Sequence, residues 1–389
     1  MRAADIVIVG GGHAGLWLGA GLARAGLDVR VVDPEPPEAL DDAADGRTLA
    51  LLGGSRRVGE QLGLWPALEP IAQPVTRVEV QDTTSDAAVL YTPAATGVAT
   101  FAWGVENRPL RLALARHFVA VAGRAAWVRG RLAGLRRDAD SIRLQLDDGS
   151  ELPAKLAVGA DGRASRLREL LHIPVSRLGY GQAALAFVVA HEREHGETVR
   201  ERLRPTGPLA LLPLRGRRCG VTWVEPEAEA RRLAGLADSA LLEILDRRIE
   251  GALGGLSLAS PVAVWPLGAQ HARRYVAARV ALIGDAAHGV HPIHAQGFNM
   301  GVADIGVLAD LLAGARAAGR DPGSPALLLA YERARWWDNE RRLRLTDGLN
   351  RLFSNDLAPA RALRGAVLRA LDSIPPLKAL AVRQGMRAG

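Results

Sequence analysis

The sequence predicts an α/β fold of composite α+β type, in which a parallel-strand unit is interleaved with an antiparallel sheet and followed by C-terminal helices. The chain begins with a short apolar strand, a glycine-rich turn, a helix and a second strand, an order typical of parallel sheets. Its middle contains strand-like apolar runs that Gly and Pro interrupt, which favours an antiparallel sheet. Beyond about residue 325 the apolar residues recur with helical spacing. With 389 residues, 48% of them hydrophobic, the chain can bury a large core.

The N-terminal stretch has the features of a dinucleotide-binding unit. The strand "DIVIVG" runs into Gly10, Gly12 and Gly15, which satisfy the pattern G-x-G-x-x-G, and the helix that follows ends near Gly26. These glycines permit a tight turn and a close backbone approach to a pyrophosphate, which the N–H groups of the helix N-terminus can bind. The second strand, "DVRVVD", ends at Asp33, where an acidic side chain would hold a ribose hydroxyl. We therefore predict a Rossmann-like dinucleotide-binding domain, and no membrane span, in this apolar stretch.

Composition argues against several other classes of protein. The net charge is +7 and the pI is about 10.3, but all except two of the 49 basic residues are arginines, and these are scattered along the chain. Because no basic block is interleaved with aromatic residues, we expect no nucleic-acid binding. The single cysteine, Cys219, offers no partner for an internal disulfide, and its apolar surroundings in "RCGVTWV" predict a buried structural thiol. A reducing cytoplasm is therefore the expected location.

The stretch "GDAAHGVHPIHAQGFNMG", residues 284–301, raises the question of a metal site. His288, His291 and His294 follow one another at three-residue steps. An apolar strand is expected before them and a helix after them, and Pro292 prevents a regular helix through the histidines. The three histidines therefore share no helical face, and their spacing matches no zinc signature. We predict that this stretch holds no metal.

Seven further stretches, taken together with the glycine loop, make the chain resemble a known family. They are "GRTLALL", "VENRPL", "VGADGRASRLREL", "YGQAALAFVVAHEREHG", "GPLALLPL", "ALIGDAAHGVHP" and "TDGLNRLFS". Their order resembles that of the flavoprotein aromatic hydroxylases with the para-hydroxybenzoate hydroxylase fold, and most of all the ubiquinone-biosynthesis hydroxylases. The resemblance implies an FAD-binding domain with a three-layer ββα sandwich, an interleaved antiparallel-sheet substrate domain and C-terminal helices.

The resemblance also implies FAD-binding roles for particular residues. The glycine loop and the end of the second strand would hold the ADP part of FAD, at Gly10, Gly12, Gly15 and Asp33. Arg47, which follows an acidic loop and precedes a helix, and Arg108, at the start of an amphipathic helix, would lie along the cofactor. Asp161 would belong to a segment linked to both FAD and NAD(P)H binding. Asp285 would hydrogen-bond the ribityl chain.

The loop before the next long helix would hold the flavin ring. Its expected members are Pro292 and the helix start at Gly297, Phe298 and Asn299. Backbone N–H groups and the positive end of the helix dipole at this point can stabilise the negative charge of a reduced flavin. The family usually has a glycine where this chain has Ala295, so the shape of the flavin pocket is expected to differ here.

Oxygen activation is expected to depend on the flavin, because no metal ligand set is apparent. The resemblance implies that NADH or NADPH reduces FAD and that O2 then forms a flavin C4a-hydroperoxide. This species would hydroxylate the aromatic ring of a prenylated phenol or quinol in ubiquinone biosynthesis. His291 is the candidate catalytic residue, with a purely structural role as the alternative. Two other functions stay open, namely a related flavin monooxygenase acting on another lipophilic or aromatic compound, and a non-catalytic FAD-binding subunit of a biosynthetic complex.

The motifs divide the chain into alternating segments. We expect FAD-binding parts at 1–75, 101–175 and 272–324, substrate-domain parts at 76–100 and 176–271, and a C-terminal helical region at 325–389. Residues 340–389 contain ten Arg or Lys against four Asp or Glu. This region could contact an anionic membrane or a partner in a quinone-biosynthesis complex, or pack with its basic face in solvent. We therefore expect a cytoplasmic protein, with a peripheral contact to the inner face of the membrane as a further possibility. Its oligomeric state stays open between a monomer and a homodimer.

Overall fold

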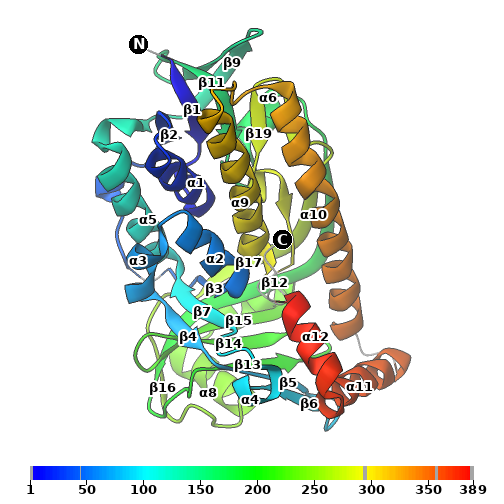
Figure 1. Cartoon of the computed structure of the whole chain (residues 1–389). Coiled ribbons are helices and arrows are strands. Elements are labelled where there is room, and N and C mark those ends of the chain that lie inside the picture. The colour runs from blue at the N-terminus through cyan, green and yellow to red at the C-terminus, as the bar shows by residue number, and fades with distance from the viewer. Residues whose placement is uncertain (1–2, 44, 292–295, 355–357, 386–389) are drawn as a thin grey trace.

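The parallel strands predicted at the N-terminus form the centre of the first sheet. The structure, a computed structural model, describes residues 3–43, 45–291, 296–354 and 358–385. Five parallel strands lie in the order β19-β11-β1-β2-β8. The first four of these are labelled in the upper part of Figure 1. Their bounds are β1 Ala4–Val9, β2 Val29–Asp33, β8 Trp127–Arg129, β11 Glu151–Gly159 and β19 Val280–Leu282. Antiparallel strands extend this sheet, namely β9 Leu132–Arg137, β10 Ile142–Leu146 and β18 Val276–Ala277.

Helix α1 His13–Arg24 lies beside this sheet and packs against two other helices. They are α5 Asn107–Ala122 and α9 Gln296–Ala317. The apolar stretch 6–23 is therefore a strand, a turn and a buried helix, as predicted. Helix α9 is long and apolar enough to cross a membrane, but 61% of its apolar window is buried inside the fold, so it is a core helix here.

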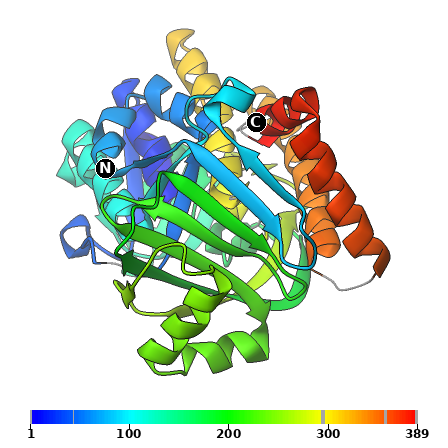
Figure 2. The ribbon, with the colours of Figure 1, turned by 90° about the horizontal axis from the view of Figure 1, so that it is seen from below.

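The middle of the chain forms the expected antiparallel sheet, with one parallel pair. Its strands follow the order β20-β17-β12-β15-β14-β13-β5-β6, with β16 beside β12 and the parallel pair between β13 and β5. The bounds are β5 Arg77–Asp82, β6 Ala88–Tyr91, β12 Val175–His191, β13 Thr198–Leu203, β14 Leu209–Leu214, β15 Arg218–Pro226, β16 Leu256–Leu258, β17 Ala263–Ala272 and β20 His288–Gly289. Helices α7 Glu227–Ala234 and α8 Asp238–Arg248 share an apolar core with this sheet (Figure 2). Cys219 lies in β15 within that core, and burial raises the pKa of its thiol to about 12, as suits a structural thiol.

A small three-stranded sheet connects the two larger ones. It contains β3 Thr48–Leu52, β7 Ala102–Glu106 and β4 Gln73–Val75. Strand β3 separates Arg47 from the helix that the sequence predicts after it, because the apolar run "TLALL" pairs with β7 and the helix begins only at Gly53. The remaining short elements are α2 Gly53–Gln61, α3 Trp65–Leu68, α4 Pro93–Thr96, α6 Arg166–Leu170, and the 3-10 turns η1 Pro37–Ala39, η2 Glu69–Ile71, η3 Arg124–Ala126 and η4 Gly284–Ala286.

The C-terminal region is helical, as its periodicity predicts. It consists of α10 Pro325–Phe353, α11 Ala358–Ser373 and α12 Pro375–Gly385. Helix α10 runs down one side of the molecule past both large sheets, α11 packs on β6, and α12 packs on α4 and α11 (Figure 1). A fully buried ion pair between Arg364 of α11 and Asp82 of β5, 3.1 Å apart, attaches these helices to the antiparallel sheet.

Candidate cofactor and active site

The glycine loop lies where β1 ends beside β11, and two of its glycines are enforced by packing. Gly10 has φ +111°, and a Cβ on it would lie 2.5 Å from the carbonyl oxygen of Ala160. A Cβ on Gly15 would lie 2.0 Å from the carbonyl oxygen of Gly10. These two positions therefore exclude any side chain within the protein itself.

Gly12 differs, because none of the residues that the structure describes occupies the space that its side chain would take. It precedes α1 with φ −81°, and a Cβ built on it meets no atom within 4 Å. Helix α1 has no side-chain cap and no acidic residue in its first turn, so its N–H groups remain available to an anion. An open cradle at a helix N-terminus fits the pyrophosphate of FAD.

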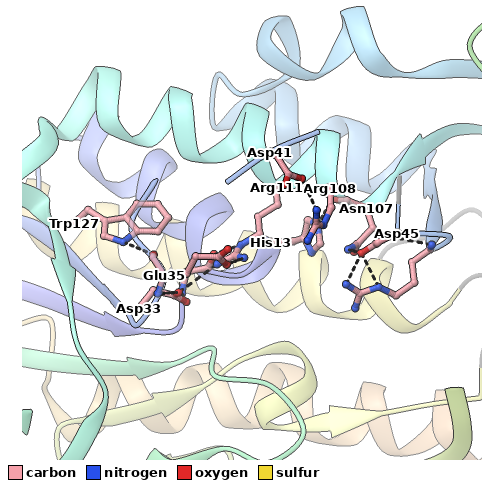
Figure 3. A network of polar contacts seen from close by, with 11 residues as sticks. His13, Asp33, Glu35, Asp41, Asp45, Asn107, Arg108, Arg111 and Trp127 are labelled. Carbon is pink, nitrogen blue, oxygen red and sulfur yellow. Dashed lines mark hydrogen bonds and ion pairs between the residues drawn. The ribbon is translucent and has the colours of Figure 1, made fainter. Parts of the chain in front are cut away.

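Asp33 lies at the end of β2, 8% exposed, and holds this loop in place. Its Oδ2 accepts a hydrogen bond from the Gly11 N–H at 2.7 Å. Arg111 of α5 donates to Asp33 Oδ1 at 3.2 Å and to the Gly11 carbonyl at 2.9 Å, and it also pairs with Glu35, as Figure 3 shows. The sequence analysis missed Arg111, although its place one turn after Arg108 on the same helix could have indicated it.

The two arginines predicted along the cofactor lie at the other end of this network. Arg108 pairs with Asp41, as Figure 3 shows, and Arg47 pairs with Asp45 at 2.6 Å. Both arginine side chains are 44% exposed. The Arg47 guanidinium also lies 4.8 Å from the ring centre of Trp265, which belongs to the antiparallel sheet. Their contact with FAD stays a prediction.

His13, in the first turn of α1, is a second residue that the sequence analysis missed. Its Nε2 lies 2.8 Å from the carbonyl oxygen of Asn107, and since a carbonyl only accepts, Nε2 donates this hydrogen bond. The ring makes an edge contact with Phe298 of α9, with ring centres 5.6 Å apart. Burial lowers the pKa of His13 to about 4, and the nearby charges of Arg111 and Arg47 act in the same direction. His13 therefore connects the glycine loop to the predicted flavin loop.

The turn that contains Asp285 is held by three side chains from three different elements. Asp304 of α9 accepts from the Gly284 N–H at 3.0 Å. Gln270 of β17 donates to the Asp285 carbonyl at 2.8 Å, and Arg168 of α6 donates to the Ala286 carbonyl at 2.7 Å. The Asp285 side chain itself is 51% exposed, with Arg163 3.6 Å away. The backbone of the turn is thus fixed while its carboxylate stays accessible to a ligand.

Asp304 lies at the centre of a buried polar cluster beneath this turn. It is fully buried and contacts His288 at 2.6 Å, Arg335 at 2.9 Å and Asn339 at 3.0 Å. Burial alone would raise the pKa of Asp304, but the charges of His288 and Arg335, with hydrogen bonds, hold it at about 2. This cluster ties α9, α10 and strand β20 to the turn.

Asp161 lies beside the glycine loop, directly after β11. Its Oδ2 accepts from the Leu167 N–H at 3.1 Å, whereas its Oδ1 is buried and has no hydrogen-bond partner within the described residues. A buried carboxylate oxygen without a partner is costly for the protein alone. It fits a donor on a bound ligand at the position that the resemblance implies.

The predicted flavin loop is described only in part. Pro292, His294 and Ala295 lie outside the described residues. Gly297 lies in the first turn of α9, and the Phe298 ring also contacts Trp17, with centres 5.8 Å apart. Asn299, 2% exposed, attaches α9 to strand β3 through Leu52 and Ala50 and to helix α2 through Ser55. Its side chain therefore positions the helix start, and a direct flavin contact stays a prediction.

His291 lies on the far side of this loop, against the antiparallel sheet. It is fully buried, and its ring makes an edge contact with Tyr180 of β12, with centres 5.2 Å apart. Burial lowers the pKa of His291 to about 4. Burial and the charge of Asp347 raise the pKa of Tyr180 to about 12. At neutral pH the pair is a neutral imidazole and a protonated phenol. Among the described residues, no group of three or more His, Cys, Asp or Glu side chains is placed to hold a metal ion.

The buried histidine predicts a loss of stability in acid. The pKa of His291 is about 4 when folded and 6.5 as a free side chain, so its stabilising effect is complete above pH 6.5 and is lost as pH falls toward 4. Between about pH 7.5 and about pH 5 this residue alone should lower the free energy of unfolding by about 2 kcal/mol. Urea titrations at both pH values should show this decrease, and His291→Gln should reduce it. An equal decrease in the variant would assign the effect to other groups.

Comparisons with known proteins agree with this geometry. A family model described as an FAD binding domain matches residues 3–342. This chain belongs to that FAD-binding family. It is 40% identical to the ubiquinone hydroxylase UbiL of Rhodospirillum rubrum, over 99% of this chain and 90% of the relative. It is 32% identical to the 3-demethoxyubiquinol 3-hydroxylase of Escherichia coli, over 98% of each chain.

A solved structure shows the same fold. The p-nitrophenol 4-monooxygenase of Pseudomonas putida matches with a TM-score of 0.81 and 16% identity, over 99% of this chain and 98% of the other. The family and the relatives identify the chain as an FAD-dependent monooxygenase. The glycine cradle, the Asp161 oxygen and the Asp285 turn are the parts of this chain that suit its cofactor.

Proposed function

We propose that this member of the FAD-binding family hydroxylates the aromatic ring of a prenylated phenol or quinol in ubiquinone biosynthesis, with NADH or NADPH as reductant and O2 as co-substrate. The observation that carries the proposal is the 40% identity to a ubiquinone hydroxylase over 99% of the chain, which includes the glycine loop and the substrate sheet. A buried apolar cluster of Val290, Met300 and Leu343 lies beside the flavin loop, so this loop adjoins an apolar part of the core.

FAD, when bound, supplies hydride acceptance and oxygen activation. The residues of the chain bind the cofactor, orient it and shield it from water. The cradle at Gly12 would bind the pyrophosphate, the fixed turn would present the Asp285 carboxylate to the ribityl chain, and the N–H groups at the start of α9 would stabilise the ring. Three hydrogen bonds from different elements hold the Asp285 turn, so its backbone is fixed without help from the cofactor.

His291 and Tyr180 are the proposed proton-handling groups on the substrate side. A hydroxylation at a phenol requires that the ring hydroxyl gain and lose a proton, and a neutral imidazole beside a phenol can pass one. His291 comes from the flavin loop and Tyr180 from the substrate sheet, so the pair lies between the two proposed binding sites.

A prenylated substrate resides in lipid, so the protein that acts on it has to reach the membrane surface. We propose a cytoplasmic protein that touches the inner face of the membrane peripherally through its C-terminal region. The basic, helical composition of that region supports a contact with anionic lipid. Membership of a quinone-biosynthesis complex is the alternative use of the same surface.

The decisive test is turnover with a short-chain prenylphenol. The FAD-loaded protein should oxidise NADH or NADPH faster when the phenol is present, and mass spectrometry should find one labelled oxygen atom in the product when isotopic O2 is supplied. His291→Gln should keep FAD but form less product. Tight FAD binding with no substrate-stimulated oxidation would favour the non-catalytic subunit, and turnover of only unprenylated phenols would favour another substrate class.

A further inference from the structure

The solvent face of α10 carries an unusual row of side chains. Leu329, Arg333, Trp337, Arg341 and Leu345 recur at intervals of four, so they are neighbours along the outer surface of the helix. Leu329, Trp337 and Leu345 are 46%, 61% and 62% exposed. We call these five residues the outward stripe. It extends over about 24 Å of helix at 1.5 Å per residue.

The opposite face of α10 explains why the stripe is not part of the core. The residues that face inward are Leu328, Tyr331, Arg335, Asn339, Leu343, Thr346, Asn350 and Phe353, all buried. They supply the Asp304 cluster and the apolar cluster beside the flavin loop. The helix therefore satisfies its packing without the stripe, whose large apolar side chains remain in solvent.

Charge is also divided between the two faces of this helix. Its acidic side chains are all engaged: Glu332 accepts from the Tyr275 N–H, Asp338 pairs with Arg335 and Arg342, Glu340 with His271 and Arg344, and Asp347 with Arg351. By contrast, Arg333 and Arg341 form no ion pair or hydrogen bond with any residue that the structure describes. The outward stripe is therefore cationic as well as partly apolar.

We propose that the outward stripe is a docking surface for an anionic lipid bilayer. Arginine binds phosphate head groups, and tryptophan and leucine enter the boundary between head groups and acyl chains. Arginine and tryptophan are also common at protein interfaces, so the choice between the two partners depends on charge. The charged members of the stripe, Arg333 and Arg341, have no acidic partner among the described residues, and an anionic head-group layer supplies the opposite charge along the whole row.

Lipid docking would serve the proposed function, and its biological role rests on that function, because a lipophilic substrate would reach the enzyme from the bilayer. The same helix that carries the stripe also borders the candidate active site, because Leu343 packs with Val290 and Met300 on its inner face. A bilayer held at the stripe would thus lie one helix away from the apolar cluster. A lipophilic substrate would then have only a short path from the lipid to the flavin loop.

The test is co-sedimentation of the full-length, FAD-loaded protein with vesicles. Phosphatidylcholine vesicles that contain phosphatidylglycerol should bind the protein, and pure phosphatidylcholine vesicles should bind it much less. The double variant Arg333→Glu with Arg341→Glu should lower the partition coefficient at least about tenfold. Trp337→Ala should lower it as well, without changing the charge. Arg247→Glu on α8, which reverses one exposed charge elsewhere, is the control and should bind like the unmodified protein.

The outcomes separate this proposal from the proposed function. Flavin absorbance and turnover of a water-soluble short-chain phenol should be unchanged in the stripe variants, which shows that they fold. Equal vesicle binding by the double variant, or no anionic-vesicle binding by the unmodified protein, would overturn the docking proposal. A shift of oligomeric state in Trp337→Ala with unaltered vesicle binding would also overturn it, in favour of a protein interface. Vesicle binding without turnover of any prenylphenol would leave the stripe in place and refute the substrate assignment.

Discussion

Gly12→Ala is expected to weaken FAD binding strongly while leaving the FAD-free protein folded. The position has φ −81°, which alanine adopts readily, and its Cβ would meet no protein atom within 4 Å. The methyl group would instead occupy the space where the pyrophosphate approaches the backbone. We expect the FAD dissociation constant to rise at least about 100-fold, equivalent to about 3 kcal/mol.

Flavin fluorescence titration measures this affinity, and urea unfolding of the FAD-free protein measures the stability. Gly314→Ala in α9 is the matched control, since its Cβ also meets no atom within 4 Å but lies far along the helix from the cradle. The control should bind FAD normally and gain up to about 1 kcal/mol of stability. Normal FAD affinity in Gly12→Ala would show that the pyrophosphate binds elsewhere.

Asp304→Ala should cause the largest loss of stability among single substitutions near the site. It leaves Arg335 and His288 buried without their carboxylate and removes the acceptor of the Gly284 N–H. Breaking a buried ion pair by removing one partner costs about 3–5 kcal/mol. The turn that presents Asp285 should also loosen, so retention of FAD should fall together with stability.

Thermal and urea unfolding, with and without FAD, check this prediction. Asp310→Ala is the control, because Asp310 lies on the same helix but is exposed; it should change stability by less than about 0.5 kcal/mol. If the two variants were equally stable, the Asp304 cluster would contribute little, and the fixed turn would need another explanation.

The local sequence pattern predicted much of the secondary structure, because most helices and strands depend on residues that are close in the chain. The alternation and glycine spacing around β1, α1 and β2 predicted the dinucleotide unit, and β2 ends at Asp33 as expected. The same kind of reasoning missed β3, because its partner β7 lies about fifty residues away and a five-residue apolar run is ambiguous by itself.

The sequence predicted a site residue only where that residue belongs to a recognisable motif with a known chemical role. Gly12, Asp33, Asp161 and Asp285 belong to such motifs. Arg111 and His13 were missed because an arginine or a histidine on a helix has no evident function until tertiary packing brings it to Gly11 or to Phe298. Arg47 and Arg108, assigned by resemblance, have carboxylate partners that sequence spacing did not indicate.

The sequence by itself determined the fold class, the cofactor-binding loop and the family, since these follow from residue types at short, regular intervals. Only the tertiary structure decided that Asp304, Arg335 and His288 form one buried cluster, that His291 meets Tyr180, and that α10 turns arginine and tryptophan to solvent. The physical reason is that burial and pairing depend on elements far apart in the chain. The interaction energy of two charges depends on their separation and on the dielectric surroundings that the folded chain creates.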